Sequence, residues 1–169
     1  AHVAHMFADT KTRGALPYVK LATIEFHKYK SRVYTIRIND QVIEKKAFSI
    51  SFANSSQFGN NAYISPSAEI DDGLIDVCIM DSFPKVEAAQ LAVKMFSKRL
   101  DQTKFMKIIR ADEVIVSSDQ PIKGHVDGEP VWFPNEIKLR VNKHSLKAIY
   151  RPTTENNLVS NIKQIIDNF

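Results

Sequence analysis

Cysteine, long apolar runs and a leader segment are scarce or missing in this chain of 169 residues. The single cysteine, Cys78, excludes an internal disulfide, so a reducing cytoplasmic location is the default expectation. No run of about twenty apolar residues occurs, and a transmembrane helix is therefore not predicted. No charged-then-apolar leader opens the chain, which starts at Ala1 rather than at a methionine. We expect a soluble segment that is entered partway through a longer protein.

Several catalytic and binding patterns are also missing. Ser51, Ser55 and Ser56 lack the G-x-S-x-G context of an exposed nucleophile, so acyl transfer is not expected. The five histidines show no paired spacing with cysteine or acid, which gives no support to a zinc centre. No basic motif interleaved with aromatic residues occurs, and nucleic acid is not an expected partner. We expect both Cys78 and Trp132 to pack inside the protein.

Positive charge is concentrated in one part of the chain. The net charge is +4 at pH 7, and residues 11–46 hold nine Lys or Arg against Glu25, Asp40 and Glu44. Such a surface suits anionic lipid headgroups, because each basic residue close to a membrane contributes about 1 kcal/mol. An ordinary solvated face has the same composition, and both interpretations stay open.

The first half of the chain predicts one helix and then strands. Apolar residues recur at helical spacing before residue 30, with Pro17 near the start of that helix. The next segments alternate with a period of two and are predicted to be half-buried antiparallel strands: residues 33–38, 41–45 and 48–52. Residues 53–72 are rich in turn-forming side chains and predict a long loop.

The second half predicts a strand, a helix and a series of short strands. Residues 74–80 form a continuous apolar strand, and residues 86–96 return to helical spacing. Short strands follow at residues 105–109, 113–116, 122–126, 130–133, 137–141 and 146–150. Behind a Thr154 N-cap, residues 158–169 predict a terminal helix. We expect a mainly β (α+β) fold, an antiparallel β-sandwich with two inserted helices and a C-terminal helix.

The first acidic candidate precedes the apolar strand. Asp71 and Asp72 lie next to Gly73 in the run Glu69-Ile70-Asp71-Asp72-Gly73-Leu74. One carboxylate from Asp72 with nearby backbone carbonyls would suit a hard cation such as Mg²⁺ or Ca²⁺. Asp-Gly is also a plain turn signal, so the pattern alone leaves a metal site and a turn as alternatives.

The second acidic candidate is His125-Val126-Asp127-Gly128-Glu129-Pro130. If this stretch is extended, Asp127 and Glu129 at i and i+2 project to one side, where one can act as a base and the other can orient it. Asp127-Gly128 between alternating strands is also a favoured hairpin turn, which is the strong alternative. For His125 we expect a structural role.

Four segments, in this order, resemble the C-terminal domain of the diacylglycerol kinase and sphingosine kinase-like lipid kinases, of the bacterial diacylglycerol kinase type: residues 54–59, Pro66-Ser67-Ala68, residues 72–77 and residues 126–130. The resemblance covers residues 1–152. One departure is visible, because Asn60-Asn61 follow Gly59 where the family tends to continue with glycine. Asparagine tolerates left-handed backbone conformations, so the turn can survive.

The resemblance implies a two-domain enzyme. In this family an N-terminal α/β domain carries a Gly-Gly-Asp-Gly-Thr nucleotide-binding signature, which this chain lacks, and the C-terminal β-sandwich closes the cleft. Residues 1–152 would be that sandwich, and the terminal helix in residues 153–169 would pack on the missing nucleotide-binding domain. ATP would then be bound mainly outside this chain, and the chain alone is expected to be inactive.

The resemblance also implies roles for individual residues. Asp127 and Glu129 match the family acids that face the γ-phosphate, and we favour Glu129 as the base for the lipid hydroxyl with Asp127 supporting it. Asp72 matches a side-chain ligand of a structural Mg²⁺ site, to which Glu69 and Leu74 would contribute backbone carbonyls. This metal would brace the loop rather than handle ATP.

The resulting hypothesis is an ATP-dependent lipid kinase, with diacylglycerol as the first candidate substrate. We expect it in the cytoplasm, peripheral at the inner membrane surface, with lipid, ATP and the membrane as partners and with a homodimer left open. The alternatives are a non-catalytic lipid-binding module and a NAD kinase-like enzyme with a nucleotide acceptor.

Overall fold

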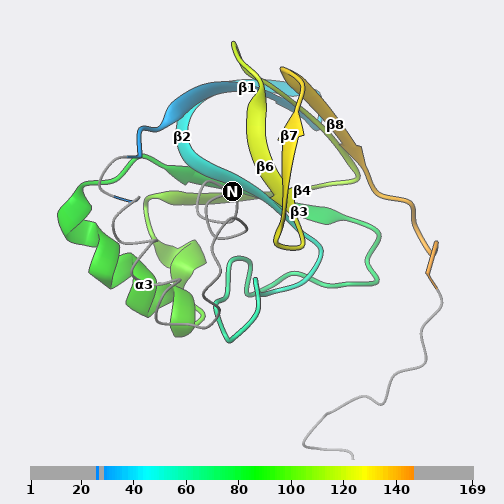
Figure 1. Ribbon diagram of the computed structural model, residues 1–169. Coiled ribbons are helices and arrows are strands. Elements are labelled where there is room, and N and C mark those ends of the chain that lie inside the picture. Colours follow the sequence, from blue (N-terminus) through cyan, green and yellow to red (C-terminus); the bar gives the residue numbers. More distant parts are fainter. Residues whose placement is uncertain (1–25, 27–28, 147–169) are drawn as a thin grey trace, which may run out of the picture.

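The computed structural model describes Phe26 and residues 29–146 (Figure 1). Four of the predicted segments lie wholly or partly outside these residues: the first helix apart from Phe26 and Tyr29, the terminal helix, residues 147–150 of the last strand, and residues 11–25, 27 and 28 of the basic segment. Within the described part, no helix is long and apolar enough to cross a membrane.

Antiparallel sheet dominates the fold, which confirms the predicted fold class. The main sheet has six strands in the order β4-β3-β2-β1-β5-β8. These strands are β1 (Arg32–Ile38), β2 (Gln41–Ala53), β3 (Ile75–Asp81), β4 (Met106–Ala111), β5 (Glu113–Ser117) and β8 (Glu136–Arg140). The remaining strands, β6 (Ile122–Val126) and β7 (Glu129–Phe133), form a separate two-stranded sheet. Figure 1 shows this hairpin standing across the curved main sheet.

Two segments predicted as separate strands, residues 41–45 and 48–52, are one continuous strand, β2. The pairing of β2 with β3 shifts between Ala47 and Ser49, because Ala47 pairs with Asp81 and Ser49 pairs with Met80. A bulge of this kind bends the strand and increases its twist. The polar pair Lys45 and Lys46 before the bulge therefore interrupts the hydrophobic pattern and not the strand.

The hairpin side of the main sheet holds the larger hydrophobic core. Its buried residues come from alternate positions of the strands and include Ile36, Ile38, Ile75, Val77, Ile79, Val114 and Val116. The hairpin contributes Ile122, which is buried, and Phe133, which packs against this cluster. Two layers of sheet thus share one core, which is the sandwich-like arrangement that the short strands predicted.

The opposite side of β3 is covered by helices and by the β2–β3 loop. Here Cys78, Met80 and Met106 of the sheet pack with Leu91, Leu100 and Ile64. Leu91 belongs to α3 (Ala88–Phe96), which follows η1 (Lys85–Glu87), and Leu100 belongs to η2 (Leu100–Gln102). Because both faces of β3 are buried, its sequence is a continuous apolar run rather than an alternating one. Cys78 is 1% exposed, as expected.

Candidate functional site

The acids Asp127 and Glu129 lie at the turn end of the β6–β7 hairpin. Val126 pairs with Glu129, so Asp127 and Gly128 form a two-residue turn between them. Both turn residues have left-handed backbones, with φ of 48° at Asp127 and 92° at Gly128. This is the conformation of a type I′ hairpin turn, which Asp-Gly favours because glycine accepts positive φ without steric cost.

The hairpin interpretation of this stretch is confirmed, and the condition for the extended interpretation is not met. Two acids at i and i+2 point the same way only when the residues between them continue a strand. Here the chain reverses at Asp127, and Glu129 begins the return strand β7. The two carboxylates belong to the same turn, but Asp127 has a left-handed backbone whereas Glu129 is the first residue of strand β7.

Glu129 lies on the face of the hairpin that is directed toward the main sheet. Side chains alternate along β7, so Glu129, Val131 and Phe133 share a face. Phe133 packs into the core, which fixes the direction of that face. Across the turn, Val126 is 54% exposed, so the hairpin extends past the buried core before it turns. Glu129 is therefore accessible to a substrate that approaches this end of the sheet.

Gly124 allows the hairpin to pack in this position. A Cβ atom at residue 124 would lie 2.5 Å from Cε2 of the Phe133 ring, which is closer than such atoms approach. The ring occupies the space that a side chain would need, so it can pack down against the main sheet. A close contact, rather than an unusual backbone angle, explains this glycine.

The turn is held by His125, whose expected structural role can now be described. The backbone N–H of Gly128 donates to Nδ1 of His125 at 3.3 Å. This arrangement uses the ring nitrogen as an acceptor and so requires an unprotonated Nδ1. Trp132 differs from the expectation of a packed core residue, because it is 64% exposed. It lies on the outer face of the hairpin, where Lys123 Nζ is 5.4 Å from its ring centre.

The other acidic stretch, residues 69–74, lies in the loop between β2 and β3. The structure confirms the long loop that was predicted for residues 53–72. In Figure 1 this loop and the turn of the β6–β7 hairpin lie toward the same end of the molecule. Asn60 and Asn61 both adopt left-handed backbones, with φ of 49° and 61°, as their tolerance of this region predicted. The backbone N–H of Asn61 donates to Oε1 of Gln57 at 3.1 Å. The turn is thus kept without the expected glycine.

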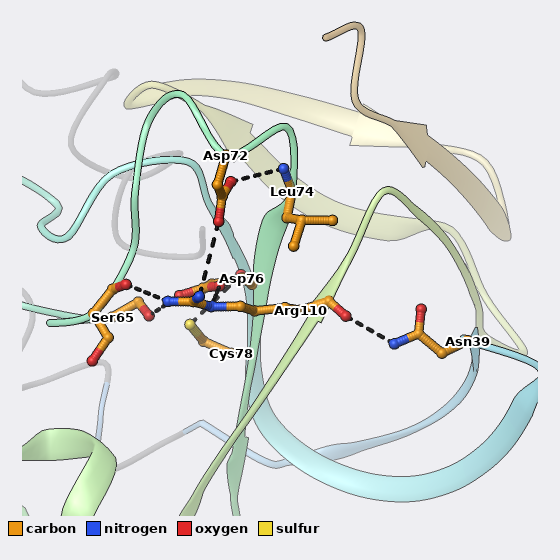
Figure 2. A network of polar contacts seen from close by, with 8 residues as sticks. Asn39, Ser65, Asp72, Leu74, Asp76, Cys78 and Arg110 are labelled. Carbon is orange, nitrogen blue, oxygen red and sulfur yellow. Dashed lines mark hydrogen bonds and ion pairs between the residues drawn. The ribbon is translucent and has the colours of Figure 1, made fainter.

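A buried polar network joins this loop to the main sheet (Figure 2). Asp76, which is 4% exposed, pairs across the sheet with Arg110, whose Nε lies 3.2 Å from its Oδ1. The hydroxyl of Ser65, a fully buried loop residue, donates to Oδ2 of the same carboxylate. Arg110 Nη2 also donates to the backbone carbonyl of Ser67. One carboxylate and one guanidinium therefore hold two points of the loop.

Sequence reasoning assigned no role to Ser65, Asp76 or Arg110. The available signal was the single acid at residue 76 inside the apolar run of residues 74–80, since a buried carboxylate needs a partner. The identity of that partner depends on the pairing of β3 with β4, which no short-range pattern determines. Cys78 lies two residues further on the same face, and burial raises the pKa of its thiol to about 12.

One carboxylate oxygen of Asp72 accepts a hydrogen bond, and the other can still bind a further partner. Its Oδ1 accepts a hydrogen bond from the backbone N–H of Leu74 at 2.8 Å. A hydrogen bond from an Asp side chain to the backbone N–H two residues later closes an Asx turn. Its Oδ2 lies 3.9 Å from Nη1 of Arg110, beyond hydrogen-bonding distance. Both contacts are visible in Figure 2.

The residues around Asp72 fit a hard cation in the kind of donor they offer. Among the described residues there is no group of three or more His, Cys, Asp or Glu side chains that could hold a metal. A cation here would need Oδ2 of Asp72 together with backbone carbonyls and water, which is a donor set that Mg²⁺ accepts. The guanidinium of Arg110 opposes a second positive charge, so such a site would be weak unless the carbonyls contribute.

The six-stranded sheet and the β6–β7 hairpin that packs against it define this chain as a β-sandwich-like domain. A family model described as the YegS C-terminal NAD kinase beta sandwich-like domain matches residues 1–146. The chain belongs to this family.

Its relatives are larger proteins. A "Probable lipid kinase YegS-like" from Chromohalobacter salexigens is 21% identical over 122 residues, which are 72% of this chain and 39% of that protein. A solved structure of a diacylglycerol kinase from Bacillus anthracis has a TM-score of 0.52 at 16% identity, over 70% of this chain and 43% of that one. The chain thus spans less than half of either protein, and the second similarity is one of fold.

Proposed function

We propose that this chain is the C-terminal domain of an ATP-dependent lipid kinase that phosphorylates a lipid hydroxyl, with diacylglycerol as the first candidate. The supporting observation is the combination of membership in a family with a named lipid kinase and two carboxylates at an accessible turn. Neither feature is sufficient alone, because a fold does not imply a function and Asp-Gly turns are common.

The chemistry assigned to the turn is general base catalysis. An alcohol is a poor nucleophile near pH 7, so a carboxylate within hydrogen-bonding reach assists by taking its proton. In the proposed step the hydroxyl oxygen forms a bond to the γ-phosphorus of ATP and its proton passes to Glu129. The bond from that phosphorus to the bridging oxygen breaks, and ADP leaves. Asp127, the first residue of the turn, would orient Glu129 or the incoming hydroxyl.

ATP is assigned mainly to a domain outside this chain. The sequence has no Gly-Gly-Asp-Gly-Thr signature, and the relatives that the chain matches are more than twice as long as the matched part. The role of this domain is then to present Glu129 and the lipid hydroxyl to a phosphate that the other domain holds. On this proposal the isolated chain has no kinase activity.

We assign the loop cation to Mg²⁺, held by Asp72 through Oδ2 and by the backbone carbonyls of Glu69 and Leu74. Such an ion would neutralise the carboxylate and brace the entrance to β3. It would lie next to the Ser65, Asp76 and Arg110 network and add a third point of attachment for the loop. Its function would be structural, and no step of the phosphate transfer involves it.

The test is phosphate transfer from labelled ATP to a panel of lipids under identical detergent conditions. The full-length protein and this chain are compared on diacylglycerol, sphingosine, ceramide and a polyprenol. We expect transfer by the full-length protein only, with one lipid preferred. Silence of the full-length protein on every lipid would contradict the kinase assignment and favour a non-catalytic lipid-binding module.

A NAD kinase-like activity is tested in the same assay by adding a dinucleotide acceptor. The description of the matching family refers to the NAD kinase β-sandwich, which makes this the relevant competing acceptor. Phosphorylation of the dinucleotide without phosphorylation of any lipid would replace the lipid kinase proposal.

A further inference from the structure

An apolar stripe lies on the outer side of the helical segment formed by η1 and α3. Its members follow the helical spacing i, i+3, i+7 and i+10: Val86, Ala89, Val93 and Phe96. Three of them are strongly exposed, Val86 to 87%, Val93 to 67% and Phe96 to 56%. We call these four residues the outer stripe.

The outer stripe is distinct from the face by which the helix packs on the sheet. That inner face consists of Leu91, which is 6% exposed, and Met95, which packs against the core of Cys78 and Met80. A helix on the surface of a globular protein ordinarily turns a polar face to the solvent. Here the helix has apolar side chains on both sides, and the outer row has no partner within the described residues. Single exposed apolar residues are common, but an aligned row of them marks an interaction surface.

The charge around the outer stripe is positive. Residues 85–104 contain five basic residues, Lys85, Lys94, Lys98, Arg99 and Lys104, and two acids, Glu87 and Asp101, so their net charge is +3. Lys94 and Lys104 line a surface depression of about 290 Å³ beside the helix, together with Leu91, Phe105 and Glu87. Figure 1 shows α3 at the periphery of the molecule, away from the β6–β7 hairpin.

We propose that the outer stripe docks on an anionic lipid bilayer. This inference rests on the proposed function, because a kinase of a membrane lipid has to meet its substrate at the bilayer. Apolar side chains on one line of a helix enter the boundary between headgroups and acyl chains, while basic residues beside them attract lipid phosphates. Another protein domain or a second copy of the chain would also cover an apolar row, but neither requires the cationic surroundings that an anionic membrane does.

The test measures flotation of the full-length protein with vesicles of phosphatidylcholine, alone or with about 30% phosphatidylglycerol to supply anionic charge. The double variant Val93→Ser/Phe96→Ser removes apolar contact and should lower the vesicle-bound fraction about tenfold. Lys94→Glu/Lys104→Glu should lower binding to the anionic vesicles only. Val42→Ser is the matched control, since Val42 is 69% exposed on strand β2 and should bind like the wild type.

Two outcomes overturn the proposal. One is a wild-type protein that binds neither type of vesicle, and the other is wild-type binding that both double variants retain. A lowered melting temperature of the serine variant would show that the substitution disturbs the fold, and its vesicle binding would then not be compared with the wild type. In that case the charge-reversal variant decides the question, because Lys94 and Lys104 line the depression beside the helix and are not part of the outer stripe: retained binding to anionic vesicles overturns the proposal.

Failure of the docking surface can be separated from failure of the kinase assignment. A short-chain diacylglycerol that is monomeric in solution requires no docking. If both proposals hold, the stripe variants keep full turnover on that substrate and lose it on vesicles. A wild-type protein that binds vesicles but phosphorylates neither form keeps the docking surface and loses the kinase function.

Discussion

The two acidic stretches of this chain look alike in sequence and differ in structure. Each places carboxylates next to an Asp-Gly pair at one end of a strand. The first stretch leads into strand β3, where Asp76 is 4% exposed and bound by Arg110 and Ser65, and Asp72 of the stretch itself is half-buried and accepts a hydrogen bond from Leu74. At the hairpin turn Asp127 and Glu129 are exposed. Carboxylates committed to partners stabilise a loop, whereas exposed ones remain available to a substrate.

This difference assigns separate tasks to the two stretches. The buried network connects β3, β4 and the β2–β3 loop, so substitutions in it should lower the free energy of unfolding. The turn acids form no ion pair among the described residues, so substitutions of these acids should lower the turnover rate and leave the stability unchanged. The following substitutions sharpen that division or break it.

The largest effect is expected from Asp76→Ala. The change leaves Arg110 without its nearest carboxylate and the buried Ser65 hydroxyl without its acceptor. Removing one partner of a buried ion pair costs about 3 kcal/mol, here at the lower end because Arg110 reaches solvent. Urea unfolding of the purified protein measures this loss. Asp127→Ala is the control and should change stability by less than about 0.5 kcal/mol; equal losses in both variants would break the comparison.

Glu129→Gln should lower turnover by about 100-fold or more in the full-length protein, which corresponds to roughly 2.7 kcal/mol in the activation free energy. The amide keeps the size of the side chain but cannot take a proton. The melting temperature should stay at the wild-type value, because the residue is exposed. A rate above about one tenth of wild type would reject Glu129 as the base, and a larger loss in Asp127→Asn would reverse the two roles.

Asp72→Ala should lower stability by about 1 kcal/mol, since it removes the acceptor for the Leu74 N–H. It should also abolish any rise of the melting temperature on addition of Mg²⁺, because only the wild type offers Oδ2 to the ion. The exposed neighbour Asp71→Ala is the control and should keep that rise. A wild-type melting temperature that is the same with and without Mg²⁺ would contradict the cation site.

The smallest effect concerns the thiol beside the buried network. Burial raises the pKa of Cys78 to about 12, so the folded protein should resist alkylation at pH 8 and react only when unfolded. An unfolded thiol titrates near pH 9, and the folded one keeps its proton to higher pH. Stability should therefore be independent of this group below pH 9 and fall as the pH rises from 9 toward 12. Rapid alkylation of the folded protein at pH 8 would show that Cys78 is accessible.

Much of the fold could be predicted from local patterns. The alternation in residues 33–38 and 41–45 correctly predicted antiparallel strands, which form the β1–β2 hairpin with φ of 48° at Asn39 and 60° at Asp40 in its turn. The apolar run of residues 74–80 correctly predicted a strand, which the structure shows to be buried on both faces. These features depend on neighbouring residues, because backbone preferences and side-chain alternation act within a few positions.

Local patterns misled where burial depends on distant parts of the chain. The spacing of Val86, Val93 and Phe96 correctly predicted a helix, yet these residues face outward and Leu91 faces the core. Trp132, the only tryptophan, lies on the outer face of its hairpin although it is strongly apolar. Periodicity locates a stripe on an element, but the neighbouring elements decide which stripe is covered.

The sequence by itself determined the class of fold, the turn at Asp127 and Gly128 and the long loop before β3, because turn chemistry and hydrophobic period are short-range properties. Only the tertiary structure decided that Arg110 meets Asp76, that Phe133 packs over Gly124 and that the outer stripe stays exposed. These contacts join residues that are distant in the chain and depend on strand order and register. Strand order follows from the free energy of burying both faces of the sheet at once, which no single segment specifies.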